Sequence, residues 1–112
     1  MKILRAISIR QPYAEQTLRG TKLREFRSVN TRIRERVWIY ASARPAADAA
    51  AWRAVGKEPG DLATGVIVGS VVIAGVDERG PDDFAYRLKD PRRCRPRKVR
   101  NQPQPRFWRP EF

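Results

Sequence analysis

Histidine is absent from this sequence of 112 residues, and Cys94 is its single cysteine. The absence of histidine excludes His-based catalytic triads, histidine metal ligands and imidazole proton shuttles. One cysteine cannot form an internal disulfide or a cysteine metal cluster. We therefore expect no metal and no cofactor. Any catalysis would have to use Lys, Arg, Asp, Glu, Ser, Thr, Tyr or Cys side chains.

Long apolar runs are also missing. No segment approaches the ~20 consecutive apolar residues that cross a bilayer, and the strand-like start of the chain lacks the apolar core of a signal peptide. We expect a cytoplasmic protein with no membrane partner. The length fits a single domain over residues 1–112 with a modest core. Within it, residues 91–112 form a basic, Pro-rich C-terminal segment.

Acidic residues are scarce at the two ends of the chain, which has a net charge of +12. Residues 1–36 carry ten Lys and Arg against three acids, and residues 91–112 carry eight against one, so each end has a charge of +7. Residues 37–90 carry six against eight, a charge of −2. Two basic ends indicate one positive face, which is typical of proteins that bind a phosphate backbone. The alternative is a basic composition without a function.

The pattern of apolar, Pro and Gly residues predicts mostly strands with two short helices. Each predicted helix begins near a proline and ends at a glycine, Gly20 or Gly56. Gly69 and Gly75 mark bulges or bends in a long β-branched strand. The prediction is an α+β fold, a small mixed β-barrel of about five to six strands. The expected elements are strands over 3–9, 22–28, 36–43, 65–78 and 82–90, helices over 11–20 and 45–56, and a last short strand around Phe107 and Trp108.

Five segments, in order, resemble the ASCH domain, the activating-signal-cointegrator homology domain, whose fold is PUA-like. The segments are SIRQPYAEQTLRGTKLREFRS, RVWIYASARP, LATGVIVGSVVIAGVDE, YRLKDPRR and RFW. The first contains the family pattern Gly-x-Lys-x-x-Glu-x-Arg as Gly20, Lys22, Glu25 and Arg27. The chain departs from the pattern at RNQPQP, where relatives often have a Gly-containing turn. There we expect Asn101 to supply the left-handed conformation.

The resemblance implies that RNA or DNA binds in a cleft beside the barrel, with the Lys-Glu-Arg set at its mouth. Glu25 and Arg27 lie two residues apart and share one face of a strand, and such a charged face is unsuited to a core. Lys22 and Arg27 can hold phosphate or a base acceptor. Glu25 only accepts hydrogen bonds and therefore suits the amino edge of a base such as cytosine or guanine. The alternative is an ion pair of Glu25 with Lys22 or Arg27 that only orients and neutralises.

Further basic and aromatic residues can extend this binding surface. Gln11 can reach a base edge, Arg10 can touch phosphate and Arg5 can extend the same face, unless these side chains are simply solvated. Tyr13 can stack on a base, as can Trp38 and Tyr40, although packing in the barrel is favoured for the last two. The densest basic run is expected to follow the nucleic-acid backbone, or else to be a mobile charged tail. It comprises Arg92, Arg93, Arg95, Arg97, Lys98 and Arg100.

A small hydrolase acting in the same cleft is the alternative function. By family analogy it would resemble an acetylcytidine amidohydrolase or a ribonuclease, with Lys22 and Glu25 as catalytic residues and Asp77 or Glu78 as a second acid. Deacetylase-like members place a threonine where this chain has Glu25, which argues against covalent deacetylation. Cys94 among arginines would have a lowered pKa if exposed, but it has no base partner. A domain that binds an acidic protein would explain the basic ends but not the Lys-Glu-Arg set.

Overall fold

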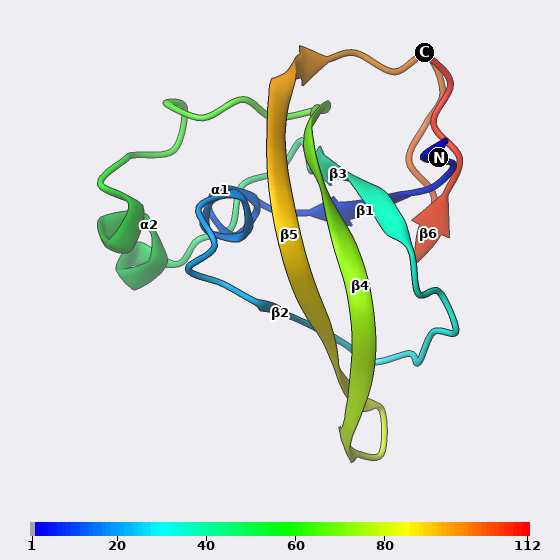
Figure 1. Cartoon of the computed structure of the whole chain (residues 1–112). Helices are drawn as coiled ribbons and strands as arrows, with labels where there is room; N and C mark the ends of the chain where they lie inside the picture. The colour runs from blue at the N-terminus through cyan, green and yellow to red at the C-terminus, as the bar shows by residue number, and fades with distance from the viewer. Residues whose placement is uncertain (1) are drawn as a thin grey trace.

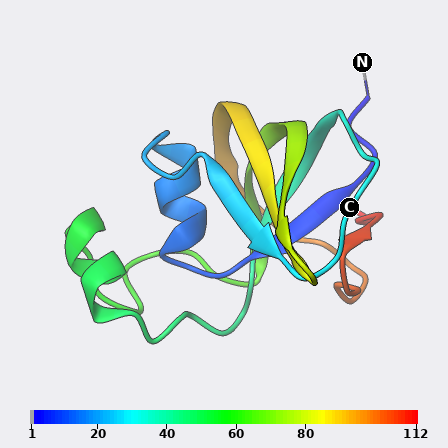
Figure 2. The same ribbon diagram turned by 90° about the horizontal axis from the view of Figure 1, so that it is seen from below.

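The computed structural model describes residues 2–112. It contains β1 (Ala6–Ile9), α1 (Tyr13–Leu18), β2 (Arg24–Arg27), β3 (Arg36–Ala41), α2 (Ala49–Val55), β4 (Val66–Gly80), β5 (Asp83–Arg97) and β6 (Phe107–Trp108). The six strands form one mixed sheet in the order β2-β5-β4-β3-β1-β6. Both helices lie to one side of the sheet (Figures 1 and 2). The predicted α+β class, six strands and two short helices are confirmed.

The sheet is not closed into the expected barrel. It ends at β2 on one side and at β6 on the other, and these two strands are not paired. β6 has only two residues, and the flanking Pro105 and Pro110 have no backbone N–H to extend a ladder. The barrel prediction is therefore wrong in its closure. An open side remains between β2 and the β1–β6 pair.

The β4–β5 hairpin is the longest part of the sheet (Figure 1). Register shifts occur next to Gly69 and Gly75, as predicted for these glycines. β5 was expected to end at residue 90 but continues through Pro91 and Pro96 to Arg97. This extension is compatible with proline because β2 pairs only with Phe84–Arg87, which leaves the later part of β5 as an edge.

Both helices are shorter than predicted at their N-terminal ends. α1 begins at Tyr13, and α2 begins after Asp48, whose carboxylate accepts a hydrogen bond from the N–H of Ala51 at 3.1 Å. An Asp N-cap, rather than the preceding proline, therefore sets the start of α2. The predicted glycine stops are confirmed, with positive φ of 77° at Gly20 and 67° at Gly56.

A buried carboxylate fastens α1 to the sheet. Glu15 is 6% exposed and receives two hydrogen bonds of 2.8 Å from the guanidinium of Arg93 on β5. The guanidinium of Arg19 donates a third, at 2.7 Å, and also reaches the carbonyl of Val55 at the end of α2. The hydrogen bonds of Arg93, opposed by burial and reinforced by Arg19, hold the pKa of Glu15 below its ordinary value.

The two ends of the chain lie side by side because β1 and β6 are antiparallel neighbours (Figure 1). Asn101 was expected to adopt the left-handed conformation in the preceding turn, but Arg106 does so instead, with φ of 66°. The side chain of Asn101 ties the tail together: its amide donates to the carbonyl of Arg109 and its oxygen accepts from the N–H of Glu111, both at 2.8 Å. Between residues 2 and 112, no helix is long and apolar enough to span a membrane.

Candidate functional site

Glu25 occupies the centre of the Lys-Glu-Arg set on β2. Its Oε1 accepts a hydrogen bond from Nζ of Lys22 at 2.9 Å, and its Oε2 accepts one from Nε of Arg27 at 2.8 Å. The Glu25 side chain is only 12% exposed. It lies in register with Tyr86, which is buried, so it faces the inner side of the sheet. The ion pairs expected as the alternative reading of this motif are therefore present.

Lys22 is placed by the turn that follows α1. The backbone N–H groups of Thr21 and Lys22 both donate to the carbonyl of Gln16 after the left-handed Gly20. This anchors the start of β2 to the helix end. The ammonium of Lys22 donates to the carbonyl of Arg24 as well as to Glu25. Two of its three donors are thereby used, and one remains for a ligand.

Arg27 bridges the open side of the sheet. Its Nη2 donates to the backbone carbonyl of Ser8 on β1 at 2.5 Å, while its Nε holds Glu25. A hollow lies on each side of this guanidinium. One, of about 350 Å³, is lined by Tyr86 and Phe107, whose rings stack at 6.1 Å between centroids. The other is a cleft of about 390 Å³ that contains Glu25.

The cleft beside Glu25 combines charge with an aromatic ring. It is lined by Ser8, Ile9, Arg10, Tyr13, Glu25, Arg27 and Ser42. The Tyr13 hydroxyl donates to Asp48 Oδ2 at 2.7 Å, and this hydrogen bond, together with burial, raises the pKa of Tyr13. The tyrosine ring is thus fixed at the cleft wall and stays un-ionised at neutral pH. The cleft therefore brings together an aromatic side chain, a carboxylate and two arginine side chains.

The family model of the ASCH domain matches residues 7–99. The chain belongs to the ASCH domain family. The match includes most of β1, all of α1 and β2, and the segment after β3, and therefore every residue that lines the cleft of this ASCH domain. No curated protein matches the chain.

Gln11 and Arg93 both bind groups within the ASCH domain. Gln11 is 2% exposed, donates to the carbonyl of Ala63 and accepts from the N–H of Glu15, both at 3.0 Å. Its amide is therefore not free to read a base edge, and that prediction is wrong. Arg93 is expected to follow the nucleic-acid backbone, but both of its terminal nitrogens bind Glu15. This partner fixes Arg93 on α1.

The other predicted basic residues remain at the surface. Arg10 is exposed at the cleft, whereas Arg5 pairs with Glu35 at 2.9 Å. The basic run is an ordered strand up to Arg97, and not a mobile tail. The guanidinium of Arg97 lies over the ring of Phe112, at 3.6 Å from its centroid. Arg95, Arg97, Lys98 and Arg100 are all exposed.

Three further predictions concern aromatic and sulfur chemistry. Tyr40 is buried and its ring meets that of Trp108 edge-on at 5.4 Å, while Trp38 packs against the same cluster, which confirms packing over stacking for Tyr40 and Trp38. Cys94 is half-buried, and desolvation raises its pKa despite the nearby Arg97. The lowered pKa was expected only for an exposed thiol, and in this half-buried one desolvation outweighs the neighbouring charge.

The second acid of the hydrolase alternative is not brought to the cleft. Asp77 lies in register with Ala85, which pairs with Phe26, so it is on the face opposite Glu25. There it binds Arg87 at 2.7 Å. Glu78 is exposed and does not line the cleft. Within residues 2–112, no group of three or more Cys, Asp or Glu residues is arranged to hold a metal ion.

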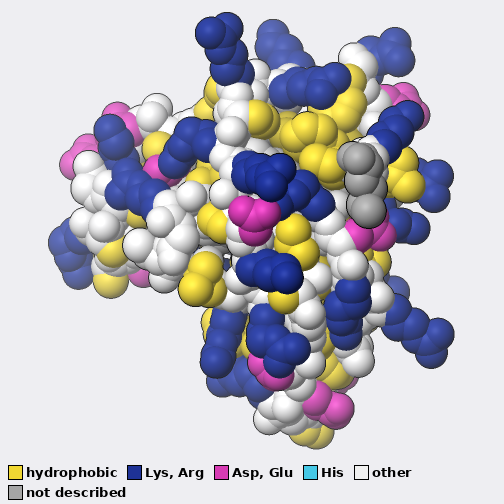
Figure 3. Space-filling view, in the orientation of Figure 1, with side chains coloured by type: hydrophobic (Ala, Val, Ile, Leu, Met, Phe, Trp, Pro, Cys, Tyr) yellow, Lys and Arg dark blue, Asp and Glu magenta, His cyan; other side chains and the backbone are white. Residues whose placement is uncertain are grey.

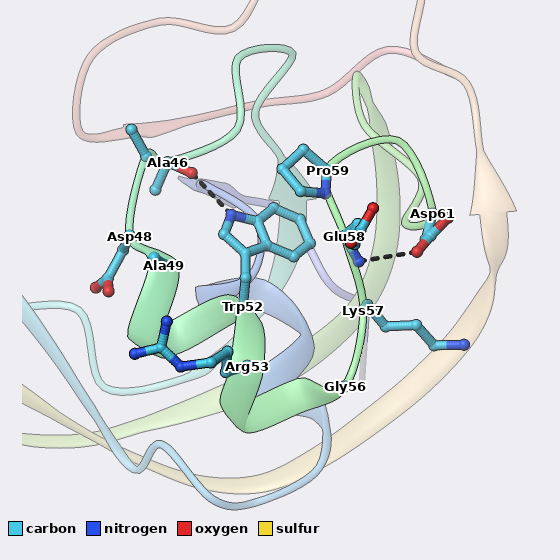
Figure 4. A pocket seen from close by; sticks show the side chains of 11 residues that line it. Ala46, Asp48, Ala49, Trp52, Arg53, Gly56, Lys57, Glu58, Pro59 and Asp61 are labelled. Atoms are coloured by element: carbon cyan, nitrogen blue, oxygen red, sulfur yellow. Dashed lines mark hydrogen bonds between the residues drawn. The ribbon is translucent and has the colours of Figure 1, made fainter.

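A larger hollow, of about 890 Å³, lies beside α2 and apart from the cleft (Figure 4). Trp52 projects into it and donates from its indole to the carbonyl of Ala46 at 2.8 Å. Its charged residues are of both signs: Arg53 and Lys57 are basic, and Asp48, Glu58 and Asp61 are acidic. None of the predicted binding residues lines it, so size alone does not make it the site.

Sequence reasoning missed three residues of the cleft wall, Ser8, Ile9 and Ser42, and also Asp48, which anchors Tyr13 from outside the cleft. Asp48 had a local signal, because an Asp before an Ala-rich helix is a typical N-cap, and the same carboxylate then anchors Tyr13. Ser8 and Ser42 have no such signal. They enter the cleft because β1 and β3 are parallel neighbours, in the register Ile9 with Ala41.

Proposed function

We propose that this ASCH domain binds RNA or DNA and receives an unpaired or flipped base in the cleft between α1, β1 and β2. The observation that carries the proposal is the position of Glu25, held between Lys22 and Arg27 at a cleft that Tyr13 also lines. ASCH domains are PUA-like modules often linked to RNA binding. The net charge of +12 supports the same class of partner.

The ion pairs of Glu25 support a role in reading a base. Each carboxylate oxygen has two acceptor sites, so Oε1 and Oε2 can each accept one more hydrogen bond. The amino group of cytosine or guanine is a suitable donor, whereas a phosphate is repelled. Lys22 and Arg27 hold the carboxylate in place and offset its charge. In this proposal the pairs that neutralise Glu25 also orient it.

The remaining residues divide by the part of the nucleic acid that they contact. Tyr13 stacks on the base. Basic side chains contact phosphates without regard to sequence. They are Arg5, Arg10, Lys22, Arg27, Arg95, Arg97, Lys98 and Arg100. Gln11 is not among them because its amide is buried, and the two terminal nitrogens of Arg93 serve Glu15 instead.

The test is binding of fluorescent single-stranded RNA, single-stranded DNA and duplex oligonucleotides over a salt series. Glu25→Gln removes the negative charge at the proposed base-binding residue. Glu58→Gln makes the same change of net charge on an exposed side chain beyond α2. We expect Glu25→Gln to change the order of preference among bases. Glu58→Gln should leave that order intact. Lys22→Ala should weaken all sequences and make the dependence on log salt shallower.

Two results would contradict the proposal. One is wild-type binding no tighter than that of an unrelated protein of equal net charge. The other is an identical order of base preference in wild type and Glu25→Gln. In the first case the hydrolase alternative, which the placement of Asp77 does not favour, should be assayed with free acetylcytidine. Turnover of a free nucleoside should depend little on salt.

A further inference from the structure

Phe26 presents its ring on the face of the sheet that is opposite the cleft. It alternates with Glu25 and Arg27 along β2 and lies in register with Ala85 on β5 and, beyond it, Asp77 on β4. The residue is 48% exposed. In the part of the chain that the structure describes, the one other exposed aromatic side chain is Phe112, which Arg97 covers. Phe is among the residue types that are most often buried, so an exposed Phe ring in a strand needs an explanation.

Cationic side chains surround this ring. The guanidinium carbon of Arg79 lies 4.8 Å from the ring centroid, and Nζ of Lys22 lies 5.9 Å from it. Arg24 and Arg87 face each other across β2 and β5 on the same side of the sheet. Figure 3 shows Lys and Arg side chains spread over the front of the β4–β5 hairpin, with a few acidic side chains between them. We call the set Arg24, Phe26, Arg79 and Arg87 the outer patch.

A glycine on the neighbouring strand leaves room for the side chain of Arg87 in the outer patch. It lies opposite Gly75, and a Cβ at that glycine would overlap its guanidinium. The missing side chain therefore lets Arg87 lie against the sheet, where Asp77 binds it at 2.7 Å. Arg79 is similarly near Asp83, at 3.9 Å. Both pairs are about half exposed, and such pairs exchange partners at little cost.

Lys22 joins the outer patch to the cleft. Its Nζ is 5.9 Å from the centroid of the Tyr13 ring, which lines the cleft, and 5.9 Å from that of Phe26. The two rings are therefore no further apart than twice this distance. The ammonium lies between them at the edge of β2, with one donor left over. A phosphate at Lys22 would have one neighbouring base at Tyr13 and another within reach of Phe26.

We propose that a single-stranded nucleic acid, RNA or DNA, continues from the cleft past Lys22 onto the outer patch, where Phe26 stacks on a second base. The inference rests on the proposed function and adds the path of the strand. Arg79, Arg24 and Arg87 hold the phosphates on this side. Alternating aromatic rings and cations are what single-strand binders use, because every base has a face to stack on. An acidic peptide would use the cations but would gain little from the ring.

The test measures how affinity depends on oligonucleotide length and on the ring at position 26. Fluorescent RNA and DNA strands of about 2 to about 12 nucleotides cover the range from cleft occupancy to a full single-strand site. We expect Phe26→Ala to weaken binding of the longest strands at least about fivefold and the shortest not at all. Phe26→Tyr keeps the ring and should restore affinity. Leu4→Ala removes another exposed apolar side chain and should bind as wild type does.

The charges of the outer patch give a second readout. Arg79→Gln should reduce the slope of log affinity against log salt by about 1 for long strands only. Arg32→Gln, the same charge change on the loop after β2, should leave the slope unchanged.

The failure of this inference is distinguishable from failure of the proposed function. If Lys22→Ala weakens strands of every length while Phe26→Ala weakens none, the cleft binds and the outer patch does not. If Phe26→Ala weakens binding of a poly-glutamate peptide but of no oligonucleotide, the patch serves an acidic protein and the inference is overturned. If wild type binds no oligonucleotide better than an unrelated protein of equal net charge, both proposals fall.

Discussion

The guanidinium of Arg27 donates to the backbone carbonyl of Ser8 at 2.5 Å, across the side of the sheet where β2 and β1 are not paired. The same group holds Glu25 at 2.8 Å. One side chain on β2 therefore replaces backbone pairing across the gap and fixes the carboxylate of the cleft. The integrity of the open side and the geometry of the cleft depend on the same residue.

Arg27→Lys keeps the charge but replaces a forked guanidinium by a single ammonium, which cannot serve Glu25 and Ser8 in the same geometry. We expect the free energy of unfolding to fall by about 1–2 kcal/mol. Arg24→Lys, on the same strand but the opposite face, should stay close to wild type. Urea unfolding of the two variants measures the difference. Equal stabilities would show that the Ser8 contact contributes nothing.

The buried Glu15 should make stability depend on acid pH. Because Arg93 holds the pKa of Glu15 below 4.5 in the folded state, the unfolded chain binds its proton first as pH falls. The stabilisation is therefore complete above about pH 4.5 and is lost as pH falls further. Glu15→Gln should lower stability at neutral pH by about 2 kcal/mol and flatten the curve below pH 4.5. Unfolding in urea from about pH 6 to about pH 3 tests this.

The control for Glu15 is Glu58→Gln, which alters an exposed carboxylate with no ion pair among residues 2–112. The loss of stability below about pH 4.5 should be the same in this variant as in wild type. If Glu15→Gln loses stability at acid pH in the same way as wild type, Glu15 is not the cause of this pH dependence.

Gly69 and Gly75 should respond differently to the same substitution. A Cβ at Gly69 would overlap the backbone carbonyl of Arg92 and the side chain of Leu18 on α1. The carbonyl belongs to the paired strand β5, so it cannot move aside without disturbing the sheet. Gly69→Ala should therefore cost about 1–3 kcal/mol. A Cβ at Gly75 would meet only the mobile end of Arg87, so Gly75→Ala should unfold near the wild-type midpoint. Thermal unfolding of both variants compares them directly, and equal losses would be inconsistent with this packing.

The hydrogen bond between Tyr13 and Asp48 should be visible in the ionisation of the phenol. Asp48→Ala removes the main cause of the raised pKa, so the pKa of Tyr13 should fall towards 10.0. Carbon NMR of the tyrosine rings during an alkaline titration measures this, with Tyr13→Phe to assign the resonance. Glu58→Ala serves as the control because it removes an acid that does not touch Tyr13. A Tyr13 midpoint unchanged in Asp48→Ala would mean that the bond does not form.

Local chemistry in the sequence determined most elements and the centre of the site. Gly20 and Gly56 end helices because a left-handed residue is needed there, and Gly69 and Gly75 mark the irregularities of β4. Alternation along β2 put Glu25 and Arg27 on one face. These features depend on neighbours a few residues apart, so backbone preference and side-chain period are enough to predict them.

Only the tertiary structure decided the features that depend on distant partners. Arg93 meets Glu15 from 78 residues away, and Gln11 is buried against Ala63, 52 residues away. No local pattern distinguishes these side chains from free ones. Closure of the sheet was also beyond the sequence, because it depends on whether the two-residue β6 can reach β2. The cleft lies at the open side, where Arg27 on β2 reaches Ser8 on β1 with its side chain in place of backbone pairing.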